Sequence, residues 1–142
     1  MRTLLLLLSV FLSALCAANE SARDKVHFNY QMSCQGCHTP DGTGAKSVPQ
    51  LKGHVGIFLQ TQQGREYLVR VPGSALSALD NDELAGVLNW ILIEFSGDSL
   101  AENYEPYTAV EVGRLRRNPL NELVLYRTKL LADITRRTGA KH

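Results

Sequence analysis

The sequence predicts an all-α fold with a C-terminal helical extension, and three observations support this prediction. Apolar residues recur at helical spacing between residues 80 and 95. A second apolar pattern with the same spacing runs over residues 121–137. Glycine and proline residues cluster over residues 39–53, where they break both helix and strand. We therefore expect a few helices joined by one long loop, with a further helix at the end of the chain.

Residues 1–18 have the features of a secretory signal peptide. Arg2 supplies the charged start, an apolar run follows, and small residues mark a cleavage point after Ala18. The run is shorter than the ~20 apolar residues that a transmembrane helix needs. Cys16 lies inside this segment, so it has no expected role in the mature protein. The sequence thus predicts export to the periplasm, with no stable membrane anchor after cleavage.

Residues 21–33 form the first predicted helix, which leads into Cys34-Gln35-Gly36-Cys37-His38. Two cysteines at C-x-x-C spacing followed by histidine are typical of c-type haem attachment. Each thiol adds to one vinyl group of the haem, and the two intervening residues let one turn present both sulfurs to the same porphyrin edge. His38 can then supply the proximal nitrogen ligand of the iron. The motif predicts one covalently bound haem c.

A zinc half-site and a redox disulfide are the alternatives for this cysteine pair. Zinc would need further Cys or His ligands at finger-like spacing, and the sequence holds no second cysteine pair. A thioredoxin-type motif follows a β-strand, and no strand pattern precedes Cys34. Haem is therefore favoured over both alternatives.

Length and charge fit one small haem domain. The chain has 142 residues, with 15 Lys and Arg against 14 Asp and Glu. Removal of Arg2 with the signal peptide makes the two counts equal, so nothing in the charge balance suggests a nucleic-acid partner. We expect a haem domain over residues 19–97, large enough to wrap one porphyrin, and a helical extension over residues 98–142.

The loop over residues 39–53 would run the backbone along the porphyrin. The carbonyl of Pro49 can accept a hydrogen bond from Nδ1 of His38, which would fix the ring and its tautomer. The alternative is an ordinary loop proline.

Two short helical pieces are expected over residues 54–70, interrupted at Gly64. Tyr67 can line the haem cavity or reach a propionate, and the alternative is a half-buried core tyrosine. The clearest helix covers residues 80–95, where Asp80 and Glu83 form a capping box. Its apolar stripe comprises Leu84, Val87, Leu88, Ile91, Leu92 and Phe95.

The C-terminal residues predict two more helices. Thr108 and Glu111 suggest a capping box that opens a helix to about Arg117, and the last helix covers residues 121–137. This tail is basic, which fits either a solvated helix face or a docking surface for an acidic redox partner. The basic residues are Arg114, Arg116, Arg117, Arg127, Lys129, Arg136 and Arg137.

Residues 21–96 resemble a class I, mitochondrial-type bacterial cytochrome c domain. The resemblance rests on the haem motif, the loop Asp41-Gly42-Thr43-Gly44, the phrase Pro49-x-Leu51-x-Gly53 and a last helix that follows Leu79-x-x-x-Glu83-Leu84. It implies the cytochrome c fold, in which the first and last helices cross beside one covalently attached haem. It also implies electron transfer between exported redox proteins.

The sequence departs from this family where a methionine normally supplies the sixth iron ligand. Leu76 stands at the expected position, and the only methionines are Met1 and Met32. Three outcomes stay open. The iron is five-coordinate with Leu76 closing an apolar pocket, His54 binds as a second histidine, or a lysine or backbone nitrogen binds weakly. Loss of methionine without replacement should lower the reduction potential and open a site for a small ligand.

Two functions follow from the sequence. The first is a periplasmic electron carrier that works as the partner or subunit of a dehydrogenase, or with an oxidase or another cytochrome. The second is a five-coordinate haem protein that binds a small ligand, as a sensor or a peroxidase-like enzyme. A peroxidase would need a distal acid–base group, for which His54 is the only candidate. An electron carrier is favoured over an enzyme.

Overall fold

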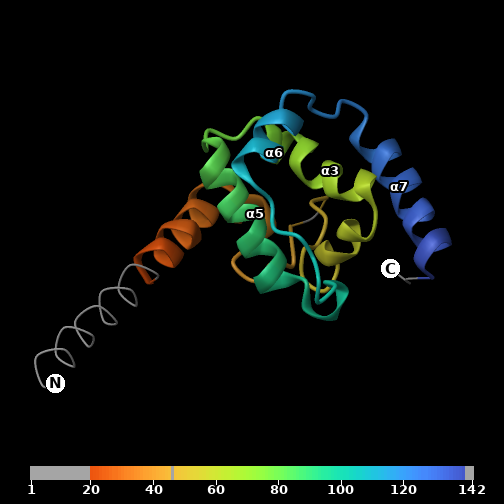
Figure 1. Cartoon of the computed structure of the whole chain (residues 1–142), viewed down its shortest axis with the longest axis horizontal. Helices are drawn as coiled ribbons and strands as arrows, with labels where there is room; N and C mark the ends of the chain where they lie inside the picture. Colours follow the sequence, from red (N-terminus) through yellow and green to blue (C-terminus); the bar gives the residue numbers. More distant parts are fainter. Residues whose placement is uncertain (1–19, 46, 140–142) are drawn as a thin grey trace, which may run out of the picture.

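The computed structural model describes residues 20–45 and 47–139. The predicted signal peptide at residues 1–18 lies outside the described residues. All regular elements in the described ranges are helices, which confirms the all-α prediction. The N-terminal helix projects from one side of a rounded body, and α7 lies at the opposite side (Figure 1). Within these ranges no helix has both the length and the hydropathy to cross a membrane.

The helices are mostly short, and two of them are 3₁₀ helices, labelled η. In chain order they are a helix over residues 20–33, α2 (Gln35–His38), η1 (Val55–Gln60), α3 (Gln62–Arg70), α4 (Pro72–Ala75), α5 (Asn81–Phe95), η2 (Gly97–Ser99), α6 (Ala109–Leu115) and α7 (Leu123–Thr138).

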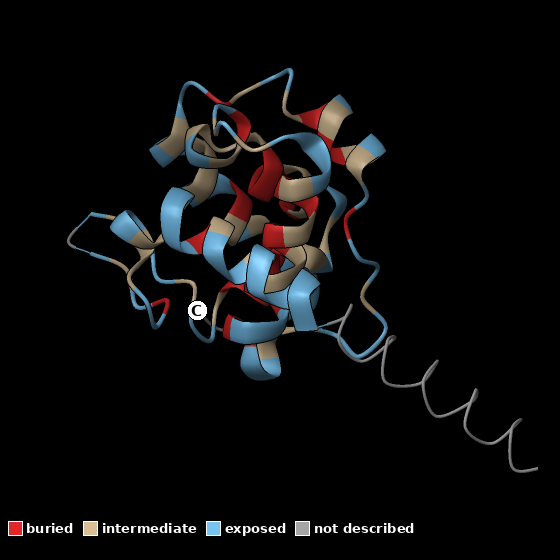
Figure 2. Ribbon diagram, turned by 90° about the vertical axis from the view of Figure 1, so that its left-hand side faces the viewer, coloured by how far each residue is buried: buried red, intermediate tan, exposed pale blue. Residues whose placement is uncertain are grey.

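Helix α5 forms the centre of the core, and the predicted capping box at its start is confirmed. The Asp80 side chain accepts from the backbone N–H of Glu83, and the Glu83 carboxylate accepts from the backbone N–H of Asp80. The predicted apolar stripe is buried against the other helices (Figure 2). The N-terminal helix crosses α5 through Tyr30, whose ring lies 4.8 Å from that of Trp90 and 5.5 Å from that of Phe95. The two helices are thus held together by aromatic packing.

The predicted helix break at Gly64 is wrong. The chain breaks at Thr61, whose side chain caps α3 by accepting from the Gly64 N–H at 3.1 Å. Gly64 lies in the first turn of α3, where a Cβ atom would collide with the backbone of Phe58. Glycine is needed here because η1 and α3 approach closely, and the helix continues through it.

The described part of the predicted extension packs into the same hydrophobic core as the predicted haem domain. Its buried residues are Tyr107, Val112, Leu115, Leu120, Leu130 and Ile134. The side chain of Thr108 caps α6 by accepting from the N–H of Glu111 at 3.2 Å. The second half of the predicted capping box is absent, because the Glu111 carboxylate binds Arg65 instead.

Candidate haem-binding site

A cavity of about 290 Å³ lies beside the end of α2, and His38 forms part of its wall. Apolar side chains from η1, α3 and the loop after α2 make most of the lining, as is usual for cofactor sites. The lining residues are His38, Ser47, Val48, Pro49, Gln50, Leu51, Val55, Phe58, Tyr67, Leu68, Val71, Pro72, Gly73, Leu123 and Arg127.

The two cysteines of the motif lie on one helical turn beside this cavity. Cys34 is the N-cap of α2, and the N–H groups of Cys37 and His38 donate to its carbonyl at 3.1 Å and 3.0 Å. Both thiols are free, with Cys34 half-buried and Cys37 exposed. Burial, and next the nearby Cys37, raise the pKa of Cys34 to about 11. The turn therefore carries both thiols and the imidazole of the motif, and of these three side chains only that of His38 lines the cavity.

The imidazole of His38 has a buried nitrogen that needs a partner. Its Nδ1 atom is buried and makes no hydrogen bond within the described part of the chain. Burial lowers the pKa of His38, and the backbone carbonyl of Pro49 acts in the opposite direction. The carbonyl of Pro49 thus lies near the imidazole, although no complete hydrogen bond forms.

The residue after His38 holds a strained backbone conformation. Thr39 has φ 63° and ψ 161°, a region that β-branched residues normally avoid. Its hydroxyl lies 2.5 Å from the His38 carbonyl and 2.8 Å from a carboxylate oxygen of Asp41. It also accepts from the N–H of Gly44 at 3.2 Å, and the Thr39 carbonyl accepts from the hydroxyl of Tyr30 at 2.6 Å. These contacts fix the direction in which the chain leaves His38.

The loop over residues 39–53 is anchored on the end of α5. The N–H of Gly53 donates to the carbonyl of Phe95 at 2.7 Å. Gly42 has φ +74°, and a Cβ atom there would lie 2.8 Å from the Phe95 ring. The N–H of Leu51 closes the loop by donating to the Gly42 carbonyl at 2.8 Å. Glycine at position 42 is therefore required both by the backbone conformation and by the close approach to α5.

The wall formed by α3 and α7 includes residues that the sequence did not reveal. Tyr67 is 5% exposed, and its ring stacks at 4.9 Å on Phe58 and at 6.0 Å on Tyr126. The guanidinium of Arg127 lies 5.9 Å from the centre of the Phe58 ring. Burial raises the pKa of Tyr67, and the charge of Arg127 opposes this shift. Leu123 and Arg127 are four residues apart on α7, which is the one sequence signal that they share a helix face.

Leu76 and His54 lie outside the lining of the cavity. Leu76 is the C-cap of α4, three residues after the lining residue Gly73, and its side chain is 72% exposed. His54 is half-buried and directly precedes the lining residue Val55. Neither position tests the predicted roles of these two residues at the iron, and both stay predictions.

The residues present fit a haem better than a bare metal ion. Across residues 20–45 and 47–139, no three His, Cys, Asp or Glu side chains gather in a way that could hold a metal. The cavity instead offers apolar walls for a flat macrocycle, and an imidazole for its iron. Two thiols stand on the adjoining turn. This donor set matches covalent haem.

Comparison with known proteins gives two relatives and no matching protein-family model. Both relatives are called cytochrome c-552, one from Thermus thermophilus and one from a named strain of that species. Each is 33% identical to this chain over an alignment of 106 positions, gaps included, and the alignment covers 61% of this chain. The matched part covers 81% of the first relative and 72% of the second.

Proposed function

The chain belongs to the class I c-type cytochromes, and from this premise we propose that it carries electrons between exported redox proteins. Its cofactor is haem c, an iron porphyrin held by covalent bonds. The observation that carries the proposal is the placement of His38 in the wall of an apolar cavity, on the same turn as two free thiols. When bound, the haem supplies a one-electron couple at its iron.

Each residue of the site has a specific role in this proposal. Cys34 and Cys37 would hold the haem through two thioether bonds, and His38 would supply a nitrogen ligand to its iron. The Pro49 carbonyl would orient His38 by accepting from Nδ1 once the haem is bound, which would also raise the basicity of the ligand. Tyr67 closes the wall from α3. The apolar lining excludes water, so that little solvent has to reorganise when the charge on the iron changes.

The wider assignments rest on the sequence. We propose export to the periplasm through residues 1–18, a haem domain over residues 19–97 and an extension over residues 98–142. The partner is a second exported redox protein, of which a dehydrogenase is the first choice and an oxidase or another cytochrome the next. The near balance of acidic and basic residues supports a protein partner over nucleic acid.

Maturation of the full chain in a bacterial host that attaches haem outside the cytoplasm tests the proposal. We expect a coloured protein whose pigment stays with the chain in acidified acetone and gives a c-type pyridine haemochrome spectrum. The double variant Cys34→Ala/Cys37→Ala should lose covalent pigment, while Cys16→Ala, which removes the third cysteine, should keep it. A wild-type chain that releases its pigment into acidified acetone would refute covalent attachment.

A five-coordinate, ligand-binding haem protein is the second candidate, and the residue at position 76 favours it. Leucine cannot bind iron, and no methionine follows the haem motif. Carbon monoxide added to the reduced protein separates the two functions. Rapid and tight binding would favour ligand binding, and no binding would indicate a sixth ligand from the chain, with His54 as the first to replace by alanine. The EPR spectrum of the oxidised protein gives the spin state independently.

A further inference from the structure

The segment between α3 and α5 forms one wall of the haem cavity with very little regular structure of its own. Only the four residues of α4 are helical there. Pro72 and Gly73, in the first turn of α4, line the cavity together with His38. The remainder of the segment runs through the exposed Leu76 to the start of α5. A wall of this kind needs support from elsewhere to stay in place.

Arg116, directly after α6, supports the far end of this wall. Its guanidinium donates from Nε to the Ala75 carbonyl at 3.1 Å, and from Nη2 to the Ser77 carbonyl at 2.6 Å. Its Nη1 donates to the Leu79 carbonyl at 2.7 Å and to the Asn81 side-chain oxygen at 3.3 Å. A single planar guanidinium thus binds three backbone carbonyls at alternate positions along the chain, which only arginine can do.

The near end of the wall is held by the same stretch of the extension. Arg70, the last residue of α3, donates from Nε to the Asn118 carbonyl at 2.8 Å. Its own carbonyl accepts from the N–H of Leu120 at 2.9 Å. Residues 116–120 therefore hold the chain immediately before and immediately after α4, and the cavity wall lies between the two attachments.

We propose that Arg116 holds residues 72–79 as a fixed wall of the haem cavity and thereby limits the entry of small neutral ligands to the iron. This inference rests on the proposed function, because it requires haem in the cavity. Arg116 acts as a positioning residue. Its removal leaves three carbonyls without their donor, and the wall then opens more often by local unfolding. A ligand that enters only through the open form binds faster in proportion to the population of that form.

The test uses the full-length holoprotein and its Arg116→Ala and Arg116→Lys variants, with Arg117→Ala as the matched control. Arg117 is the exposed neighbour on the same turn. The association rate of carbon monoxide with the reduced protein should rise by about tenfold in Arg116→Ala, since tenfold corresponds to the loss of one good hydrogen bond. The association rate in Arg116→Lys should lie between those of the wild type and Arg116→Ala, because one ammonium cannot reach three carbonyls at once. Arg117→Ala should leave the rate unchanged.

Backbone hydrogen exchange gives a second readout that does not depend on the iron. The N–H groups of Ala75 and Leu76 donate to the carbonyls of Val71 and Pro72. They should exchange at least tenfold faster in Arg116→Ala, while amides in the middle of α5 keep their protection. This pattern would separate a local effect on the wall from general destabilisation, which would raise exchange in α5 as well.

Three results would overturn the inference. Unchanged exchange at Ala75 and Leu76 would show that Arg116 does not hold the wall. Faster exchange with an unchanged carbon monoxide rate would show that the wall does not limit entry. The third is wild-type protein that carries no covalent haem, which would refute both the proposed function and this inference. Haem content is therefore measured on every sample.

Discussion

The loop over residues 39–53 contains no helix in its described positions, and the stretch over residues 105–120 contains only α6. The two segments are held in different ways. The loop is held by backbone hydrogen bonds, such as the one from the Gly53 N–H to the Phe95 carbonyl. The second stretch is held by arginine side chains, namely Arg65 and Arg116. A backbone that must lie close to a flat cofactor has little room for side chains. A segment remote from the cofactor can use long side chains and their charges.

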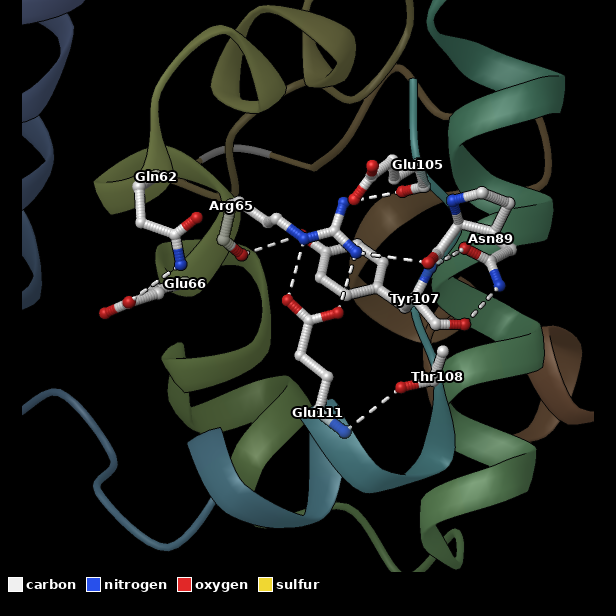
Figure 3. A network of polar contacts seen from close by, with 9 residues as sticks. Gln62, Arg65, Glu66, Asn89, Glu105, Tyr107, Thr108 and Glu111 are labelled. Carbon is white, nitrogen blue, oxygen red and sulfur yellow. Dashed lines mark hydrogen bonds and ion pairs between the residues drawn. The ribbon is translucent and has the colours of Figure 1, made fainter. Parts of the chain in front are cut away.

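Arg65 is the centre of the second mode of attachment (Figure 3). Its Nε and Nη2 atoms each lie 2.7 Å from a carboxylate oxygen of Glu111, and Nη1 donates to the Glu105 carbonyl at 2.6 Å. Its guanidinium also lies 4.3 Å from the centre of the Tyr107 ring. The Tyr107 hydroxyl in turn donates to the Arg65 carbonyl at 2.7 Å, and its backbone pairs with the Asn89 side chain.

Loss of the haem should lower the stability of the protein the most, and the loss should be concentrated in the loop over residues 39–53. The cavity of about 290 Å³ would lack its contents in the Cys34→Ala/Cys37→Ala chain. An empty apolar cavity lowers stability because its lining atoms lose their packing partners, so the free energy of unfolding should fall by more than in any single substitution below. Urea unfolding of the holoprotein and of this variant measures the difference. Hydrogen exchange should show protection lost first over residues 39–53, and equal loss over residues 105–120 would contradict the comparison.

Replacement of Arg65 should cause the next largest loss of stability, and this loss should be concentrated in residues 105–120. In Arg65→Ala the Glu111 carboxylate, whose side chain is 19% exposed, loses its partner. We expect the free energy of unfolding to fall by about 2–4 kcal/mol, somewhat less than the ~3–5 kcal/mol for a fully buried pair, because both side chains are partly exposed. Arg65→Lys should recover only part of this, because lysine cannot bind the carboxylate through two parallel bonds. Urea unfolding of the holoprotein measures both.

A double-mutant cycle sharpens this prediction. If Arg65 and Glu111 act as a pair, the loss in Arg65→Ala/Glu111→Ala should be smaller than the sum of the two single losses. Arg114→Ala, which removes an exposed arginine of α6, is the control and should change the free energy of unfolding by less than ~0.5 kcal/mol. Additive single losses would show that the carboxylate has no energetic link with Arg65.

The sequence predicts the contacts of the loop over residues 39–53 better than those of the stretch over residues 105–120, for a physical reason. The constraints at Gly42 and His38 are local, because positive φ and the haem motif leave their mark on neighbouring residues. The contacts of Arg65 and Arg116 join residues 35 or more positions apart. In the sequence both arginines look like ordinary surface charges, and Arg116 is one of seven basic residues in the C-terminal tail. Arginines on a solvated helix face and arginines that bind distant parts of the chain give the same amino-acid composition.

The wall near α7 shows the same limit within the candidate site. For Tyr67 the sequence leaves two interpretations open, a residue of the haem cavity and a core tyrosine, and the structure places it in the lining of the cavity. Arg127 could not be placed there from the sequence, because its distance from His38 in the sequence carries no information about the way α7 folds back. Arg136 and Arg137 are different again, since both pair with Asp133 on their own helix and leave the cavity untouched.

The smallest effect should come from Asp41, the only charge in the hydrogen-bond network after His38. Hydrogen bonds from the hydroxyls of Thr39 and Thr43 lower the pKa of this exposed carboxyl from 3.8 to about 2. A depressed pKa means that the stabilisation is fully present above pH ~4 and is lost as the pH falls towards 2. The holoprotein should therefore be more stable than Asp41→Asn in urea at pH 5, and the difference should vanish near pH 2.

Glu102→Gln, which removes an exposed carboxylate after η2, is the control and should show no such convergence. A gap between wild type and Asp41→Asn that stays constant from pH 5 to pH 2 would mean that the side chain holds the loop by its shape and its neutral hydrogen bonds, with no contribution from its charge.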